Sequence, residues 1–234
     1  MADQLGVDMS PGWRLVDAET LTGPPAAVAP TLLGRVLVRR HAPTDDGTVE
    51  GARWARIVEV EAYAGADDPA SHAARGRTSR NATMFGRAGL LYVYFTYGMH
   101  HCANVVVGPD GEPGAVLVRA AEPIGGLDLM AAARTRARSP RQLCSGPAKL
   151  CEALSIDRVH DGVDLLDAAS PVLLVDDGVA PPRRPERSGR IGIRVATERP
   201  WRFCVPASPW TSRPSGARRA GGAPHPTSSR ERRS

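Results

Sequence analysis

Short stretches in which apolar and polar residues alternate recur along the chain, and this period of two predicts β-strands. We expect them at residues 35–40, 56–63, 90–107, 190–195 and 202–205, with shorter ones between residues 161 and 176. Helical patterns are brief. They cover residues 15–34, where prolines interrupt them, residues 125–137, and the stretch that follows Pro147. Strands therefore dominate the predicted structure.

The longest alternating stretch, residues 90–107, predicts a β-hairpin that turns near Tyr97 and Gly98. Its tip is unusual, because solvent-facing turns normally carry Asn, Asp, Gly or Ser. Here Tyr97, Met99, His100 and His101 surround Gly98. One interpretation is a buried turn that another segment covers. The other is an exposed wedge, since proteins that open a duplex push an apolar side chain into the base stack.

The strand at residues 56–63 carries two carboxylates. A strict period of two places Val58, Val60 and Ala62 on one face and Ile57, Glu59, Glu61 and Tyr63 on the other. Two buried acids without partners would be costly. The residues therefore indicate either a half-exposed face with Arg partners or a general base in a pocket floored by Tyr63.

Composition predicts one soluble domain. A chain of 234 residues with 42% hydrophobic content can bury a substantial core. No secretion signal opens the sequence, and no apolar run reaches the ~20 residues of a membrane helix, so we expect a cytoplasmic protein with no membrane partner. The four cysteines show no C-x-x-C spacing and make no disulfide framework. We expect reduced cysteines in the core.

The net charge of +5 is concentrated at the C-terminus. Residues 213–234 hold six Arg and one Glu, which leaves 24 basic and 24 acidic residues in the rest of the chain. A DNA-binding face on the body would therefore need a local cluster such as residues 72–87, which contain four Arg, Arg80 among them, and no acid. Such a run is also typical of a solvated loop. We expect a disordered segment at 1–12, one domain at 13–212 and a disordered basic tail at 213–234.

Many short motifs occur together, in register from about residue 32 to residue 210, and resemble the alkyladenine (3-methyladenine) DNA glycosylase family. They are Glu61-Ala62-Tyr63, His72, Arg80-Asn81, Met84-Phe85, residues 91–94, residues 97–99, Asn104, residues 119–123 and residues 143–150. The resemblance implies an α+β fold, with a single mixed α/β domain on a curved, mainly antiparallel sheet and a protruding β-hairpin. It also implies a monofunctional enzyme of base excision repair that flips a damaged purine from duplex DNA and hydrolyses the N-glycosidic bond.

The resemblance assigns roles position by position. It implies that Glu61 deprotonates the attacking water and that Arg119 helps to hold this water. Tyr63, His72 and Tyr94 match residues that sandwich the extruded base, and Asn104 matches one that borders it and disfavours guanine. Tyr97 matches the side chain that fills the gap in the duplex, with Met99 and His100 along the minor groove. The segment around Gly192 is similar to one whose backbone approaches the pocket.

The residues themselves support parts of this assignment. Asn104 and Arg119 lie on successive predicted strands, so pairing across residues 108–114 can bring both to one pocket. The single lysine, Lys149, lies near a predicted helix start, where it can bind a DNA phosphate. It is the only lysine available for a Schiff base, and the chain begins with Met, so we expect hydrolysis without lyase activity.

We expect no cofactor and no metal. His100, His101 and Cys102 are adjacent on a strand and point to alternating faces, which rarely closes a tetrahedral site. The expected partner is double-stranded DNA containing alkylated or deaminated purines, bound by a monomer in the nucleoid of a bacterial cytoplasm.

Two other classes of protein compete with this interpretation. A hydrolase of small glycosides would need two carboxyls that face each other across the substrate, and neighbours on one strand are poorly placed for that. A non-catalytic nucleic-acid-binding module could use the aromatic residues as a stacking platform, and it would need no Glu in the pocket. Release of free base distinguishes these alternatives.

Overall fold

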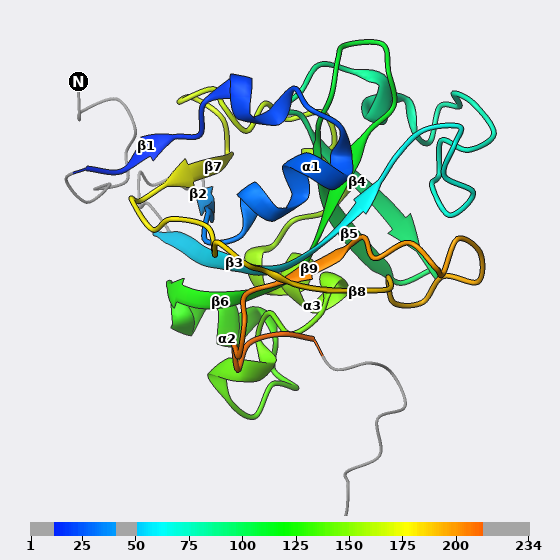
Figure 1. Cartoon of the computed structure of the whole chain (residues 1–234). Coiled ribbons are helices and arrows are strands. Elements are labelled where there is room, and N and C mark those ends of the chain that lie inside the picture. Colours follow the sequence, from blue (N-terminus) through cyan, green and yellow to red (C-terminus); the bar gives the residue numbers. More distant parts are fainter. Residues whose placement is uncertain (1–11, 41–50, 213–234) are drawn as a thin grey trace, which may run out of the picture.

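One curled, mainly antiparallel sheet runs through the computed structural model, which describes residues 12–40 and 51–212 (Figure 1). The strand order is β1-β7-β2-β3-β6-β5-β4, β9 also pairs with β3, and β8 pairs with β9. The strands are β1 Arg14–Leu15, β2 Val36–Arg40, β3 Ala52–Tyr63, β4 Leu91–Thr96, β5 His100–Val106, β6 Ala115–Gly125, β7 Val172–Asp176, β8 Glu186–Ser188 and β9 Arg202–Cys204. The α+β class and the antiparallel hairpin β4–β5 are as predicted.

Helices are few and short in the described residues. They are α1 Pro25–Val28, α2 Leu127–Ala133 and α3 Pro147–Leu154, with 3-10 turns η1 Ala18–Leu21, η2 Ala29–Leu32, η3 Ala82–Phe85, η4 Pro140–Gln142 and η5 Arg158–His160. In Figure 1, α2 and α3 lie below β6, and α1 lies above β3 with the N-terminal segment. No helix among the described residues is long and apolar enough to cross a membrane. The expected disordered tail and most of the expected disordered N-terminal segment lie outside the described residues.

β3 is the strand that organises the sheet. Its first half pairs with β2, its residues Glu59–Glu61 pair with β9 on the same side, and β6 pairs along its length. The pairing with β6 is irregular between Ile57 and Val60. Such a β-bulge inserts a residue and changes which face the following side chains occupy.

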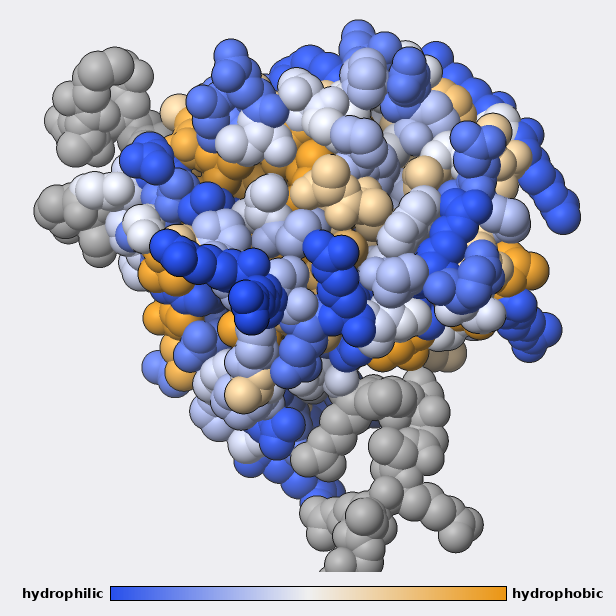
Figure 2. Space-filling view, viewed as in Figure 1, coloured by the Kyte–Doolittle hydropathy of each residue, from blue (hydrophilic) through white to orange (hydrophobic). Residues whose placement is uncertain are grey.

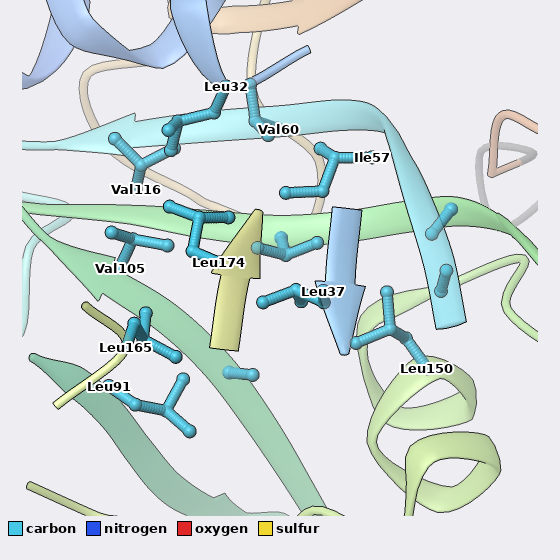
Figure 3. Packing of buried hydrophobic residues seen from close by; sticks show 14 of the residues in the cluster. Leu32, Leu37, Ile57, Val60, Leu91, Val105, Val116, Leu150, Leu165 and Leu174 are labelled. Atoms are coloured by element: carbon cyan, nitrogen blue, oxygen red, sulfur yellow. The ribbon is translucent and has the colours of Figure 1, made fainter. Parts of the chain in front are cut away.

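The bulge corrects one prediction about β3. Ile57 was expected beside Glu59 and Glu61, but Ile57 and Val60 both point into the main hydrophobic core (Figure 3). Leu37, Leu150 and Leu174 reach the same core from β2, α3 and β7 (Figure 3). The core does not include Glu59, Glu61 or Tyr63. Because the bulge lies between Ile57 and these residues, Ile57 does not share their face, as strict alternation would require.

Two other predicted elements differ from the structure. Residues 190–195 form no strand, and the short β8 lies just before them. The physical reason is that Ile191 donates its backbone N–H to the carboxylate of Glu61 and not to a neighbouring strand. The helix expected at residues 125–137 is only α2, because β6 extends to Gly125 and the chain turns at Gly126, whose φ of +67° is left-handed.

Candidate active site

An open cavity of about 570 Å³ lies between the β4–β5 hairpin, the loop after β3 and residues 191–195. The side chains that line it include every residue predicted to surround a base, together with the second predicted catalytic residue: Tyr63, His72, Tyr94, Asn104 and Arg119. Tyr97 also reaches its edge. Residues from three separate parts of the sequence therefore meet in one cavity.

The side chains of the aromatic wall of the cavity contact one another. The His72 and Tyr94 rings meet edge to face with centroids 4.4 Å apart, and His72 Nδ1 lies 3.1 Å from the hydroxyl of Tyr92. Tyr92 packs against Tyr94 because both occupy one face of β4. Asn104 donates its amide to the Tyr92 carbonyl at 3.0 Å, so its side chain is fixed within the wall.

Burial controls the protonation of this wall. It raises the pKa of Tyr92 to about 12 and also raises the pKa of Tyr94. The pKa of the His72 imidazole is lowered by burial first and by the nearby Arg80 charge second. At neutral pH the wall therefore consists of two phenols and an uncharged imidazole, which are surfaces on which a purine can stack.

Glu61 is fully buried, with an exposed fraction of 0%, and it is not among the residues that line the cavity. It lies behind three residues that do line it, Tyr63, Arg119 and Ile191. Its Oε1 accepts the Ile191 N–H at 2.7 Å and lies 3.2 Å from Arg119 Nη1, and its Oε2 accepts the hydroxyl of Tyr63 at 2.8 Å. A carboxylate offers about four acceptor positions. The Ile191 N–H occupies one on Oε1, where Arg119 is also an ion-pair partner, and the Tyr63 hydroxyl occupies one on Oε2. One position on Oε2 is therefore left for a further donor.

Glu59 has a different environment, although it shares a face with Glu61. It is also 0% exposed, and its oxygens accept from Arg119 Nε at 3.2 Å, from Arg202 Nε at 2.6 Å and from both the backbone and hydroxyl of Ser212. The expected Arg partners are therefore present for both acids, but the expected half-exposed face is wrong, because Glu59 and Glu61 are both fully buried. Arg119 joins the two acids, with Nε toward Glu59 and Nη1 toward Glu61.

The hairpin tip is exposed, so the interpretation of a buried turn is wrong. Tyr97 is 84% exposed and Met99 is 69% exposed. Thr96 pairs with His100, which leaves Tyr97, Gly98 and Met99 to form the turn. Tyr97 has a φ of +52°, a left-handed conformation that is uncommon for a bulky residue. The turn thus holds an aromatic side chain in solvent at the edge of the cavity.

The remaining predicted DNA contacts lie at the surface. His100 is exposed at the start of β5, and Arg80 donates to the backbone carbonyl of Phe95 at 2.9 Å, which braces the hairpin. Lys149 is exposed on α3, with Nζ 3.2 Å from the hydroxyl of Ser145. Each of these side chains is accessible to a large partner.

Two features escaped the sequence interpretation. Tyr92 shares the face of Tyr94 on β4, and the alternation of that strand contained this information. Asp68 and Arg190 form a fully buried ion pair behind Tyr63, at 2.6 and 2.7 Å, and nothing in the local sequence indicated it. Within residues 12–40 and 51–212, no three His, Cys, Asp or Glu side chains are grouped as metal ligands.

Comparison with known proteins identifies the family of this chain. The model of the methylpurine-DNA glycosylase family matches residues 19–209. Relatives named "Putative 3-methyladenine DNA glycosylase" include one from Burkholderia lata, which is 54% identical over 80% of this chain and 86% of its own length. Another, from Streptomyces avermitilis, is 46% identical over 83% of this chain and 89% of its own. A third, from Methanocella arvoryzae, is 45% identical over 81% of this chain and 92% of its own length.

These matches cover the strands that build the cavity, from β2 to β9, and also the hairpin and the loop at residues 191–195. The chain therefore belongs to the methylpurine-DNA glycosylase family of DNA repair enzymes.

Proposed function

We propose that this protein removes damaged purines from duplex DNA by flipping the nucleotide into the cavity and hydrolysing its N-glycosidic bond. The observation that carries the proposal is the juxtaposition of an aromatic cavity, a buried Glu61 paired with the cavity-lining Arg119, and an exposed Tyr97 at the cavity edge. The substrates are alkylated or deaminated purines, and the protein acts on them as a monomer.

The cavity suits an extruded purine. Tyr63, His72 and Tyr94 present rings to its interior, and an electron-poor alkylated base stacks favourably on such rings. Asn104 borders the same space with its amide already held by Tyr92. A fixed amide at that position discriminates against a normal guanine, whose exocyclic amine it would meet.

Glu61 serves as the general base in this proposal. The free acceptor position on Oε2 takes a hydrogen bond from the attacking water, and Arg119 holds the water from the other side. An alkylated base is cationic and leaves readily, so orienting the water and accepting its proton are the main tasks of the enzyme.

Tyr97 fills the space that the extruded nucleotide leaves. Its ring is exposed before DNA binds, and the turn holds it at the cavity edge. Met99 and His100 then follow the minor groove, while Arg80 and Lys149 contact phosphates.

Release of free base from a duplex with one hypoxanthine or one alkylated purine tests the proposal. General bases contribute roughly 10²–10⁴-fold, so Glu61→Gln should bind the lesion duplex with wild-type affinity and release base at least about 100-fold more slowly. Glu152→Gln, on the exposed face of α3, is the matched control and should retain the wild-type rate. A Glu61→Gln protein with full activity would refute the role of Glu61.

Borohydride treatment tests the absence of lyase activity. An enzyme that cleaves the backbone passes through a Schiff base that borohydride traps as a covalent adduct. Lys149 is the only lysine, and its Nζ lies beside Ser145 and not among the residues that line the cavity. We expect no adduct, and a trapped protein–DNA species would show that the reaction is not simple hydrolysis.

A further inference from the structure

Behind the wall of the cavity lies a buried ion pair that the proposed reaction does not use directly. Arg190 donates two hydrogen bonds to Asp68, from Nη1 at 2.6 Å and from Nη2 at 2.7 Å, and both side chains are 0% exposed. Arg190 Nη1 also donates to the Ala62 carbonyl at 2.9 Å. Desolvating two charges is expensive, so a buried pair of this kind is weak evidence for stability alone. Its contacts with neighbouring residues therefore indicate its role better than its charge does.

Glu61 accepts hydrogen bonds from two groups, the Tyr63 hydroxyl and the Ile191 N–H, and Arg190 is linked to both of them. Its guanidinium carbon lies 4.7 Å from the centroid of the Tyr63 ring, whose hydroxyl donates to Glu61 Oε2. The residue that follows it, Ile191, donates its backbone N–H to Glu61 Oε1. One donor is thus attached to Arg190 through ring stacking and the other through the peptide chain.

The Ile191 donor needs such an anchor. Residues 190–195 belong to no strand, so no ladder of hydrogen bonds fixes the position of this backbone N–H. Gly192, the next residue, has a φ of +82° and gives the segment further conformational freedom. The contacts of Arg190 with Asp68, Ala62 and Tyr63 are what tie the segment to the end of β3.

We propose that Arg190, clamped by Asp68, is a positioning residue that aims the carboxylate of Glu61 at the attacking water. This inference rests on the proposed function, because it assigns the pair a purpose in the same reaction. Arg190 acts by holding the Ile191 N–H and the Tyr63 hydroxyl against Glu61, so that Oε2 keeps one acceptor position directed to the water. It does not itself touch the substrate.

The test replaces the pair with neutral side chains of similar size, as Arg190→Gln with Asp68→Asn. The double variant avoids leaving one buried charge unpaired. The variant should weaken the hydrogen bonds that Glu61 accepts from Tyr63 and Ile191. Loss of one hydrogen bond to a charged group should lower the single-turnover rate of base release by about 10- to 100-fold. Affinity for the lesion duplex should stay within about threefold, because the variant retains the side chains of the cavity wall.

The pH profile separates positioning from a structural defect. A carboxylate that loses a donor binds a proton more readily, so the acidic limb of the rate profile should move to higher pH in the double variant. The charged and titratable groups near Glu61 are Tyr63 of β3, Arg119 of β6, Cys102 of β5, Arg202 of β9 and Arg190 itself, with Glu59 beyond Arg119. His72 also titrates in the cavity, but it is unchanged in the variant, so it adds the same component to both profiles.

Arg199→Gln is the matched control. Arg199 stacks on Trp201 at 4.7 Å, as Arg190 does at 5.2 Å, and among the described residues its ion-pair partner is Glu198 at 3.8 Å. It should keep the wild-type rate and profile. Arg190→Lys retains a cation beside Asp68 without the two-pronged hydrogen bond, and it should give an intermediate rate. This variant also keeps the test available if the double variant does not fold.

The outcomes distinguish the inference from the proposed function. A double variant or an Arg190→Lys variant with the wild-type rate and acidic limb overturns the positioning role. A lower rate also overturns it if titration of active sites shows that the whole loss comes from a smaller fraction of folded enzyme and the acidic limb of the pH–rate profile has not moved. By contrast, a wild-type protein that releases no base, or a Glu61→Gln variant that releases it normally, overturns the proposed function itself.

Discussion

Tyr97 offers a perturbation whose effects on stability and on function should separate. Its ring is 84% exposed, so truncation to Ala removes few contacts of the folded protein. Exposed substitutions usually change the free energy of unfolding by less than about 0.5 kcal/mol. The backbone at Tyr97 is left-handed, with a φ of +52°, a conformation that costs a residue with a Cβ about 1–2 kcal/mol. Gly escapes that cost, but it loses about 0.5–1 kcal/mol through the greater freedom of the unfolded chain.

Tyr97→Ala should therefore unfold within about 2 °C of the wild-type Tm, since 1 kcal/mol corresponds to about 2–4 °C in a chain of this size. Tyr97→Gly should be equally or slightly more stable. Both should bind a lesion duplex about 5- to 150-fold more weakly, because stacking of one base on an aromatic side chain is worth about 1–3 kcal/mol. Thermal unfolding, equilibrium binding and the fluorescence of 2-aminopurine beside the lesion measure the three quantities.

Val159→Ala is the matched control for this prediction. Val159 is 81% exposed on η5 and does not line the cavity, so its truncation should alter neither stability nor binding. Two results would refute the reasoning. A Tyr97→Ala protein that flips and binds normally would show that the tip does not fill the duplex, and one destabilised by several kcal/mol would show that the ring has a structural role.

Three further predictions follow from the same structure. Gly126→Ala should lower the free energy of unfolding, measured in urea, by at least about 2 kcal/mol, because the φ of Gly126 is +67° and an added Cβ would lie 2.3 Å from the Ala52 carbonyl oxygen. Gly76→Ala is the control: an added Cβ there has nothing within 4 Å, so it should lower the same free energy by only about 1–2 kcal/mol. The pKa of His72 is lowered in the folded protein, so its contribution to stability is complete above the unfolded-state pKa of about 6.5 and is lost as the pH falls. The Tm of His72→Gln should therefore decline less than that of the wild type between about pH 7 and pH 5. An equally steep decline would contradict this. Deletion of residues 213–234, which hold six Arg, should make the affinity for undamaged duplex less dependent on salt, and an unchanged slope would leave the tail a role in solubility only.

The surface agrees with a protein that meets a polar partner. Hydrophilic residues cover most of the face shown in Figure 2, with apolar residues interspersed among them. Among the large hydrophobic residues that the structure describes, the most exposed are Tyr97, Val159 and Met99, two of which lie on the hairpin tip. Their exposure supports the proposal that the tip enters the duplex.

Local pattern alone determined the parts of the protein that depend on neighbouring residues. The alternation of residues 90–107 placed the hairpin and its turn, because side chains on a strand must alternate between its faces. The same rule put Glu59, Glu61 and Tyr63 on one face. It predicted that Asn104 and Arg119 can reach one cavity, and the structure supplied the register, in which Asn104 pairs with Leu117, two residues away from Arg119 on β6.

Only the tertiary structure decided the roles of the two acids and the state of the tip. Glu59 is paired with Arg202 and accepts hydrogen bonds from Ser212, both more than 140 residues away in the sequence. The Ile191 backbone that meets Glu61 was expected in a strand. The bulge that turns Ile57 into the core depends on how β3 pairs with β6, and the Asp68–Arg190 pair joins residues 122 positions apart. Such features arise from packing between distant segments, and the periodicity of a single strand carries no information about which partner will neutralise a charge or cover a face.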